Sequence, residues 1–217
     1  MSIKIADMQV DYVDHMGSDV NVVNAARCSF AKEVKDFDLE KDTKLINYLA
    51  KHNHFTPLAH TSVTIRVKAP IFMARQFVKH QIGLVWNEES RRYIDDEPEF
   101  YIPKELRGRP VNAKQGSNGV LESSELFTDM IVSESSRCLD LYKRLLEANV
   151  APEQCRMVLP QNVMTNWMWT GSLVAFARVV KLRTDTHAQQ EAQELGWLIH
   201  NAIKDLYPVS WKALMDN

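Results

Sequence analysis

The stretch that decides the fold is "TSVTIRVKAPIFMARQFVKHQ", residues 61–81, because two patterns of different period meet in it. Apolar and polar residues alternate over residues 61–68, which is the pattern of a half-buried strand. Pro70 follows where the first turn of a helix tolerates proline, and residues 71–81 then predict a helix that ends at Gly83. The stretch therefore predicts a strand followed directly by a helix.

Further segments extend this alternation of helices and strands along the chain. Apolar periodicity predicts helices over residues 42–52, 121–149, 151–160, 172–182 and 186–206, and the segment 121–149 is one helix or two broken at "SESS". Asp185 or Thr186 is expected to cap the last of them. "NVMTNWMWT", residues 162–170, is rich in aromatic and β-branched residues and predicts a second strand. Without a βαβ rhythm, a repeat or a linker, we expect a single α+β domain over residues 1–217.

The glycine-rich segment "RGRPVNAKQGSNGV", residues 107–120, holds three of the seven glycines and three basic side chains. It predicts a loop.

Composition and charge exclude several classes of protein. With 26 basic and 28 acidic residues the formal net charge is -2, so no overall basic field attracts nucleic acid or anionic lipid. The three cysteines are odd in number and lack CxxC spacing, which argues against a disulfide framework and against a zinc knuckle. No run approaches the roughly 20 apolar residues of a membrane span, and no signal peptide is evident. We expect a cytoplasmic protein, or one of the host cytosol if the chain is viral.

Polar side chains gather in and just before "KHQIGLVWNEESRRY", residues 79–93. On a continuous helix, Gln76, Lys79 and His80 would share one face, and acids, a serine and two arginines follow within a few residues. Such a cluster suits a phosphate and a polar heterocycle, because arginine binds phosphate bidentately. The alternative is that "EESRR" is a solvated helix face making weak ion pairs.

A second set of basic residues lies in the last third of the chain. Arg178 stands in the apolar "LVAFARVVKLR", where it either reaches water or meets an anion, and Arg183 stands where that helix ends. His52, His54 and His60 lack the spacing of a metal site and no acid or cysteine completes one, so no metal is predicted. Glycine-rich nucleotide-binding turns are also absent from the sequence.

Several blocks together resemble the flavin-dependent thymidylate synthases, the ThyX family. They are "NAARCSF", "LINYLAKHNHFTPLAH", "VKAPIFMARQFVKHQ", "NEESRRY", "RMVLP" and "KLRTDTHAQQE", in the family's order. The resemblance implies a twisted antiparallel or mixed sheet with flanking helices, assembled as a homotetramer with sites at subunit interfaces. It also implies conversion of dUMP to dTMP with 5,10-methylenetetrahydrofolate as carbon donor, FAD as hydride carrier and NADPH as reductant.

Matching positions in these blocks imply the site residues. For dUMP they are Gln76, Lys79, Glu88, Glu89, Ser90, Arg91, Arg92, Arg156 and Arg183. For FAD they are Thr56, Lys79, His80, Gln81, Glu88, Ser172, Val174 and Arg178. For catalysis they are Arg183, Ser90 and His54, with Arg183 stabilising the anion that develops on the uracil ring. The family uses no enzyme nucleophile on that ring.

The chain also departs from the family pattern. The RHR signature is Lys79-His80-Gln81, and the segment between Gln81 and Ser90 is one residue longer than the common pattern. Ala59 stands where a glutamate is common, and Ser172 and Val174 stand where an asparagine-x-arginine is usual. These changes fall mainly on flavin contacts, so two alternatives stay open: a flavin-dependent pyrimidine-nucleotide hydroxymethylase, or a catalytically inactive oligomer that binds dUMP.

Overall fold

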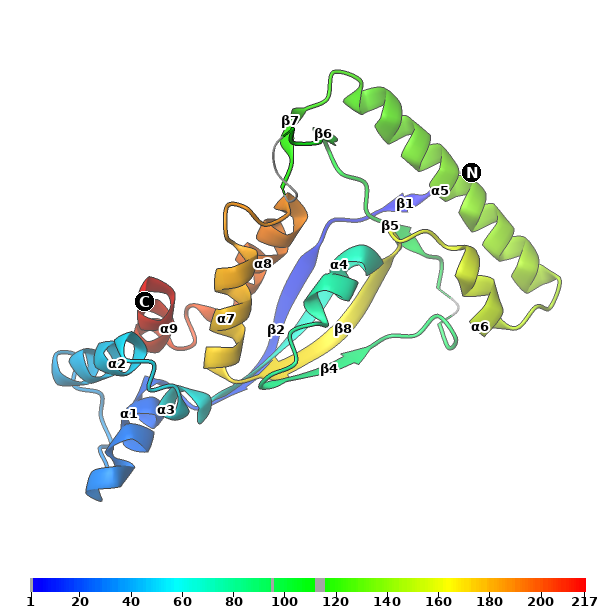
Figure 1. Ribbon diagram of the computed structural model, residues 1–217. Coiled ribbons are helices and arrows are strands. Elements are labelled where there is room, and N and C mark those ends of the chain that lie inside the picture. The colour runs from blue at the N-terminus through cyan, green and yellow to red at the C-terminus, as the bar shows by residue number, and fades with distance from the viewer. Residues whose placement is uncertain (1, 95, 112–115) are drawn as a thin grey trace.

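A four-stranded antiparallel sheet forms the centre of the computed structural model, which describes residues 2–94, 96–111 and 116–217 (Figure 1). The strands in spatial order are β2 (Gln9–Met16), β3 (Ser62–Pro70), β8 (Met164–Gly171) and β4 (Leu84–Glu88). β3 and β8 confirm the two predicted strands, and they pair over eight positions from Val63↔Gly171 to Pro70↔Met164. β2 and β4 were not predicted. The α+β class with an antiparallel sheet and flanking helices is confirmed.

The main core lies between one face of this sheet and three helices. Alternate residues of β3 and β8 point into it, among them Ile65, Val67 and Trp169, each with no exposed surface. The helices that cover this face are α4 (Ile71–Phe77), α7 (Leu173–Arg183) and α8 (Gln190–Ile203) (Figure 1). Because side chains alternate across a strand, the period read over residues 61–68 determined which face of β3 is buried.

A second cluster of helices lies beyond one end of the sheet (Figure 1). It comprises α1 (Asp19–Arg27), the 3₁₀ turn Cys28–Phe30, α2 (Lys41–Lys51), α3 (Thr56–Ala59) and α9 (Pro208–Asp216). Asp19 is 8% exposed, and its two carboxylate oxygens accept hydrogen bonds from the backbone N–H groups of Val209 and Ser210. A side chain of α1 thus caps the first turn of α9, which ties α1 to the C-terminal helix.

A third cluster packs beyond the other end of the sheet around Phe100, Leu139 and Cys155. Its elements are β1 (Lys4–Ile5), β5 (Glu99–Phe100), α5 (Ser124–Glu147), α6 (Pro152–Cys155) and the 3₁₀ turn Arg156–Val158. α5 runs unbroken through "SESS", which resolves the choice between one helix and two. No helix of the described residues is both long and apolar enough to cross a membrane.

The predicted loop at residues 107–120 is partly regular. Its two ends pair as the short antiparallel strands β6 (Arg107–Gly108) and β7 (Asn118–Val120), so the prediction of a loop is wrong there. Residues 112–115 of this segment lie outside the described residues. The pairing brings Arg107 and Ser117 close to the start of α8.

Two predicted helix boundaries are also wrong. α4 ends at Phe77, six residues before Gly83, because the chain must turn there to enter β4. Gly83 has φ +75°, and its carbonyl accepts a hydrogen bond from the Ser172 N–H. α8 begins at Gln190 instead of Thr186, since Asp185 accepts hydrogen bonds from His187 and holds a turn.

Candidate active site

Arg183, the last residue of α7, is the centre of one polar group. Its Nε donates to His80 Nε2 at 2.9 Å, and its two terminal nitrogens donate to Oε1 and to the backbone carbonyl of Gln76, at 3.4 Å and 3.2 Å. The guanidinium carbon lies 5.4 Å from the centre of the Phe77 ring. The C-terminal end of α7 and the end of α4 with the turn after it therefore bring together Gln76 and Arg183, which were expected at dUMP, and His80, which was expected at FAD.

The electrostatics of this group leave a cation without a counterion. Burial, and after it the charge of Arg183, lowers the pKa of His80 to about 4, so the ring is neutral at physiological pH and its Nε2 can accept. Burial also lowers the pKa of Arg183, but arginine stays protonated in proteins. Within the described ranges no carboxylate makes an ion pair with Arg183. The guanidinium is thus available to an anionic or strongly accepting ligand.

A hollow of about 520 Å³ opens beside this cation. Its lining includes Gln76, Arg183 and His187, together with Ser117 and Gln189. Arg107 also lines it, so the hollow offers hydrogen-bond donors and acceptors beside two guanidinium groups, a combination that suits a polar heterocycle.

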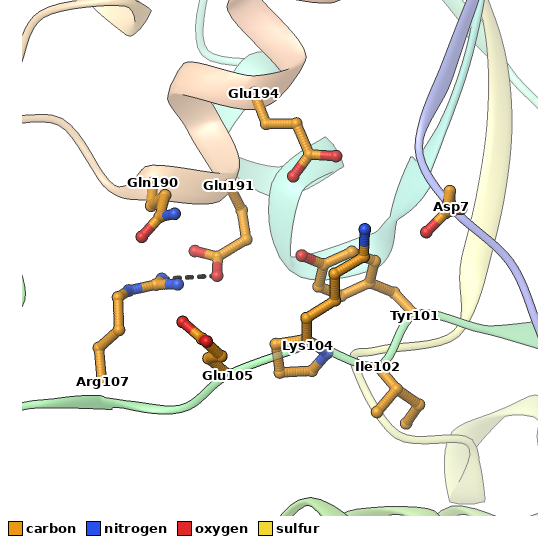
Figure 2. Close-up of a pocket in the computed structure, with 10 residues that line it drawn as sticks. Asp7, Tyr101, Ile102, Lys104, Glu105, Arg107, Gln190, Glu191 and Glu194 are labelled. Carbon is orange, nitrogen blue, oxygen red and sulfur yellow. Dashed lines mark hydrogen bonds and ion pairs between the residues drawn. The ribbon is translucent and has the colours of Figure 1, made fainter. Parts of the chain in front are cut away.

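Three residues that sequence reasoning missed extend the network away from Arg183. Gln76 Nε2 donates to Gln189 Oε1 at 2.8 Å, and Gln189 Nε2 donates to Glu191 Oε2 at 2.9 Å. Arg107 then donates to Glu191 Oε1 at 2.6 Å, a contact that Figure 2 shows. The available signal was the "AQQE" of the family block, which places two amides and an acid beside the Arg183 helix.

A second polar group lies where β4 ends. Ser90 Oγ accepts hydrogen bonds from Arg156 Nη1 at 3.4 Å and from Arg92 Nε at 3.3 Å. Arg91 turns instead to the backbone carbonyl of Asp96. Because "NEESRR" forms the end of a strand and a turn, the alternative of a solvated helix face is wrong. Two exposed guanidinium groups on one hydroxyl suit an anion such as phosphate.

Glu88 and Glu89 are both held against β8. Glu88 Oε1 accepts from Thr165 Oγ1 at 2.8 Å, and Glu89 Oε2 accepts from Asn166 Nδ2 at 2.7 Å. These bonds fix the carboxylates beside Ser90. In the part of the chain that the structure describes, no hydrogen bond joins the Ser90 group to the Arg183 group.

The residues expected at the flavin do not lie together. Lys79, His80, Gln81 and Arg178 line a small hollow of about 190 Å³. Arg178 is exposed and donates to the carbonyl of Ile82 at 3.3 Å. The prediction that Gln76, Lys79 and His80 share one helix face is wrong, because α4 ends before Lys79.

His54 and Thr56 are exposed and line a different, larger hollow of about 580 Å³ formed by α1, α2 and α3. Phe30, Tyr48 and Phe55 add aromatic rings to it. The other two expected contacts serve the fold: Ser172 accepts from the Ala175 N–H as N-cap of α7, and Val174 is 8% exposed in the second cluster. Among the described residues, no cluster of three or more His, Cys, Asp or Glu side chains could hold a metal ion.

Comparisons with known proteins point to one family. A family described as "Thymidylate synthase complementing protein" matches residues 11–209. A flavin-dependent thymidylate synthase from Thermosipho africanus is 40% identical over 99% of this chain and 94% of its own length. Another from Thermus thermophilus is 36% identical over 96% of this chain and 76% of its own length. The structure of a UMP/dUMP methylase, PolB from Streptomyces cacaoi, bound with 5-Br dUMP, superposes with a TM-score of 0.88 at 28% identity, covering 100% of this chain and 97% of that one.

Proposed function

The chain belongs to the flavin-dependent thymidylate synthase family, and we propose that it converts dUMP to dTMP with FAD, 5,10-methylenetetrahydrofolate and NADPH. The balanced reaction is dUMP, methylenetetrahydrofolate, NADPH and one proton giving dTMP, tetrahydrofolate and NADP⁺. The enzyme thus joins a one-carbon unit to C5 of uracil, and the proton at C5 leaves.

The observation that carries this proposal is the Arg183 guanidinium, half-buried and hydrogen-bonded only to uncharged partners. Attack by C5 on a one-carbon unit requires negative charge to build on the uracil ring. A fixed cation with no counterion stabilises such charge without reorganising as the reaction proceeds. Gln76 beside it offers an amide to the polar edge of the pyrimidine.

Ser90, Arg92 and Arg156 are the groups that we assign to the phosphate of dUMP. Their two guanidinium groups converge on one hydroxyl at the surface, where a dianion would replace the serine as their acceptor. We assign Glu88 and Glu89 to the same side of the nucleotide, since both are held next to Ser90.

The residues present fit a flavin dinucleotide as well. Lys79 and Arg178 provide two cations on the rim of one hollow, which suit a pyrophosphate, and His54 and Thr56 line an apolar hollow with aromatic rings, which suits a stacked ring system. FAD, when bound, would supply the hydride that reduces the transferred carbon to a methyl group. The chain's own residues would hold it and exclude water.

We propose a homotetramer with sites at subunit interfaces. The Arg183 and Ser90 groups share no hydrogen bond among the described residues. In an oligomer, the Arg183 group of one subunit and the Ser90 group of a neighbouring subunit could bind the same nucleotide. α5 also exposes a stripe of apolar side chains, with Leu126 60%, Phe127 44% and Met130 53% exposed. Such a stripe on a helix favours a protein partner. Light scattering on the purified protein would give the number of subunits.

The experiment that tests the function is release of tritium from C5-labelled dUMP, with FAD, NADPH and methylenetetrahydrofolate each supplied and then omitted. Release that needs both flavin and folate supports the synthase, and the mass of the product separates a methyl from a hydroxymethyl group. Arg183→Ala should retain the fold and the bound flavin but lose roughly a hundredfold or more in turnover. Full activity in this variant would refute the role of Arg183.

UMP is a second candidate substrate, because the similar PolB structure is described as a UMP/dUMP methylase and is also known with 5-Br UMP, at a TM-score of 0.87. The same assay with C5-labelled UMP decides between the two sugars. A colourless preparation that binds dUMP and releases no tritium would favour the inactive oligomer instead.

A further inference from the structure

We propose that Glu191 is a positioning residue for Arg183, acting through two glutamine amides that it orients in series. The inference rests on the proposed function for its catalytic meaning, but its geometry does not depend on turnover. The relay, as we call it, consists of Arg107, Glu191, Gln189, Gln76 and Arg183.

The direction of the relay follows from the chemistry of its members. An ionised carboxylate can only accept, so Gln189 must present its NH₂ group to Glu191. Its carbonyl oxygen then faces Gln76, which must donate to it. The remaining oxygen of Gln76 faces Arg183 Nη1. Glu191 thus determines that Nη1 of Arg183 meets an acceptor, the side-chain oxygen of Gln76, although Gln76 and Arg183 are 107 residues apart in sequence.

The carboxylate is held in its charged form where it stands. Glu191 is 6% exposed, and both of its oxygens accept, one from Arg107 and one from Gln189. Burial alone raises the pKa of Glu191, but the hydrogen bonds from Arg107, from the backbone and from Gln189 outweigh it, and the pKa lies below its usual value. The relay is therefore intact at neutral pH.

Exchange of Glu191 for glutamine would reverse this direction. Glutamine has one acceptor oxygen, and the charged Arg107 competes for it more strongly than the neutral Gln189 does. The new NH₂ group would face Gln189, whose amide must flip to accept from it. Gln76 must then flip as well, and two donors would meet at Arg183 Nη1. The guanidinium would have to move.

α8 provides a matched control. Glu194 lies three residues further along the helix and lines the same cavity of about 490 Å³, but Figure 2 shows it directed away from Arg107. It has no hydrogen bond among the described residues. Glu194→Gln therefore removes an acid from the same cavity, where it repels Glu191, and removes none of the hydrogen bonds of the relay.

The test compares Glu191→Gln, Gln189→Met and the double variant with Glu194→Gln in the flavin-loaded enzyme. Gln189→Met interrupts the relay and keeps the ion pair of Glu191 with Arg107. We expect kcat to fall roughly tenfold to a hundredfold in either relay variant, with no further fall in the double variant, because both remove one effect. Glu194→Gln should stay within about twofold of the parent. Equal kcat in Glu191→Gln and Glu194→Gln, or multiplying losses in the double variant, would overturn the proposal.

A second readout separates this inference from the proposed function. NMR titration of the His80 ring reports its contact with Arg183 whether or not the protein makes thymidylate. The pKa of His80 should stay at about 4 in the parent and in Glu194→Gln. In Glu191→Gln it should rise above about 4, because the charge of Arg183, the smaller of the two causes of the lowered pKa, moves away while burial of the ring remains. Absence of thymidylate in the parent would refute the function alone, whereas an unchanged His80 in Glu191→Gln would refute the relay alone.

Discussion

Replacing Arg107 with alanine should destabilise the protein strongly and in a way that depends on pH. Arg107 and Glu191 form an ion pair at 2.6 Å, with side-chain exposures of 20% and 7%. Loss of one partner from a buried pair costs about 3–5 kcal/mol, because the other charge stays buried without compensation. Gln189 still donates to Glu191, and the Arg107 end is partly hydrated. We therefore expect Arg107→Ala to lose about 3 kcal/mol of unfolding free energy at pH 8.

The sign of the pH dependence follows from Glu191. In the parent its pKa is lowered on folding, so its contribution to stability is present above 4.5 and is lost as the pH falls. In Arg107→Ala, burial acts with much less opposition and raises the pKa of Glu191 above that of the unfolded chain. The folded variant then takes up a proton as the pH falls, which removes the penalty. Between pH 8 and pH 5 the parent keeps this contribution, so it is protonation of Glu191 in the variant that makes the difference in stability between the two proteins smaller at pH 5 than at pH 8.

Urea unfolding followed by tryptophan fluorescence at pH 8 and pH 5 measures this difference in free energy. Arg109→Ala is the matched control, since Arg109 is an exposed arginine two residues away with no hydrogen bond or ion pair among the described residues. The reasoning would be refuted by equal stabilities of the two variants at pH 8. A larger loss for Arg107→Ala at pH 5 than at pH 8 would refute it as well.

Two further expectations concern the binding group at Ser90 and the ring of His80. Ser90→Ala should raise the KM for dUMP about fivefold to twentyfold and leave kcat within about threefold of the parent. The reason is that the change removes one hydroxyl, a donor and an acceptor, from the phosphate group's site. Steady-state kinetics measures both constants, and an unchanged KM would contradict the assignment. The folded pKa of His80 lies at about 4, below the unfolded 6.5, so stability should fall as the pH drops from 6.5 towards 4. After allowance for solvent screening of a half-exposed ring, the loss is roughly 1–2 kcal/mol. His80→Gln should lack this part of the slope in the same unfolding assay.

Much of the candidate site was predictable because its residues carry their signal locally. Charge and hydrogen-bonding groups concentrated in "KHQIGLVWNEESRRY" marked the region of Ser90, and an arginine at the end of an apolar helix marked Arg183. Gln189 and Glu191 carry no such concentration of charge, and their one signal is the "AQQE" of the family block. An amide and an acid at the start of a helix are ordinary there, and only contact with Gln76 and Arg107 gives them a role.

The sequence by itself determined the elements whose periodicity is strong: the strand around Ile65, the strand around Trp169 and the helices that cover them. A period of two or of 3.6 residues is a local property, and burial of one face enforces it. Only the tertiary structure decided where α4 and α8 begin or end, because a tight turn into β4 and a turn at Asp185 compete there with helical propensity. Only the tertiary structure also decided which side chains converge on Arg183. Those contacts join segments more than a hundred residues apart, so tertiary packing and not the local sequence determines the partners.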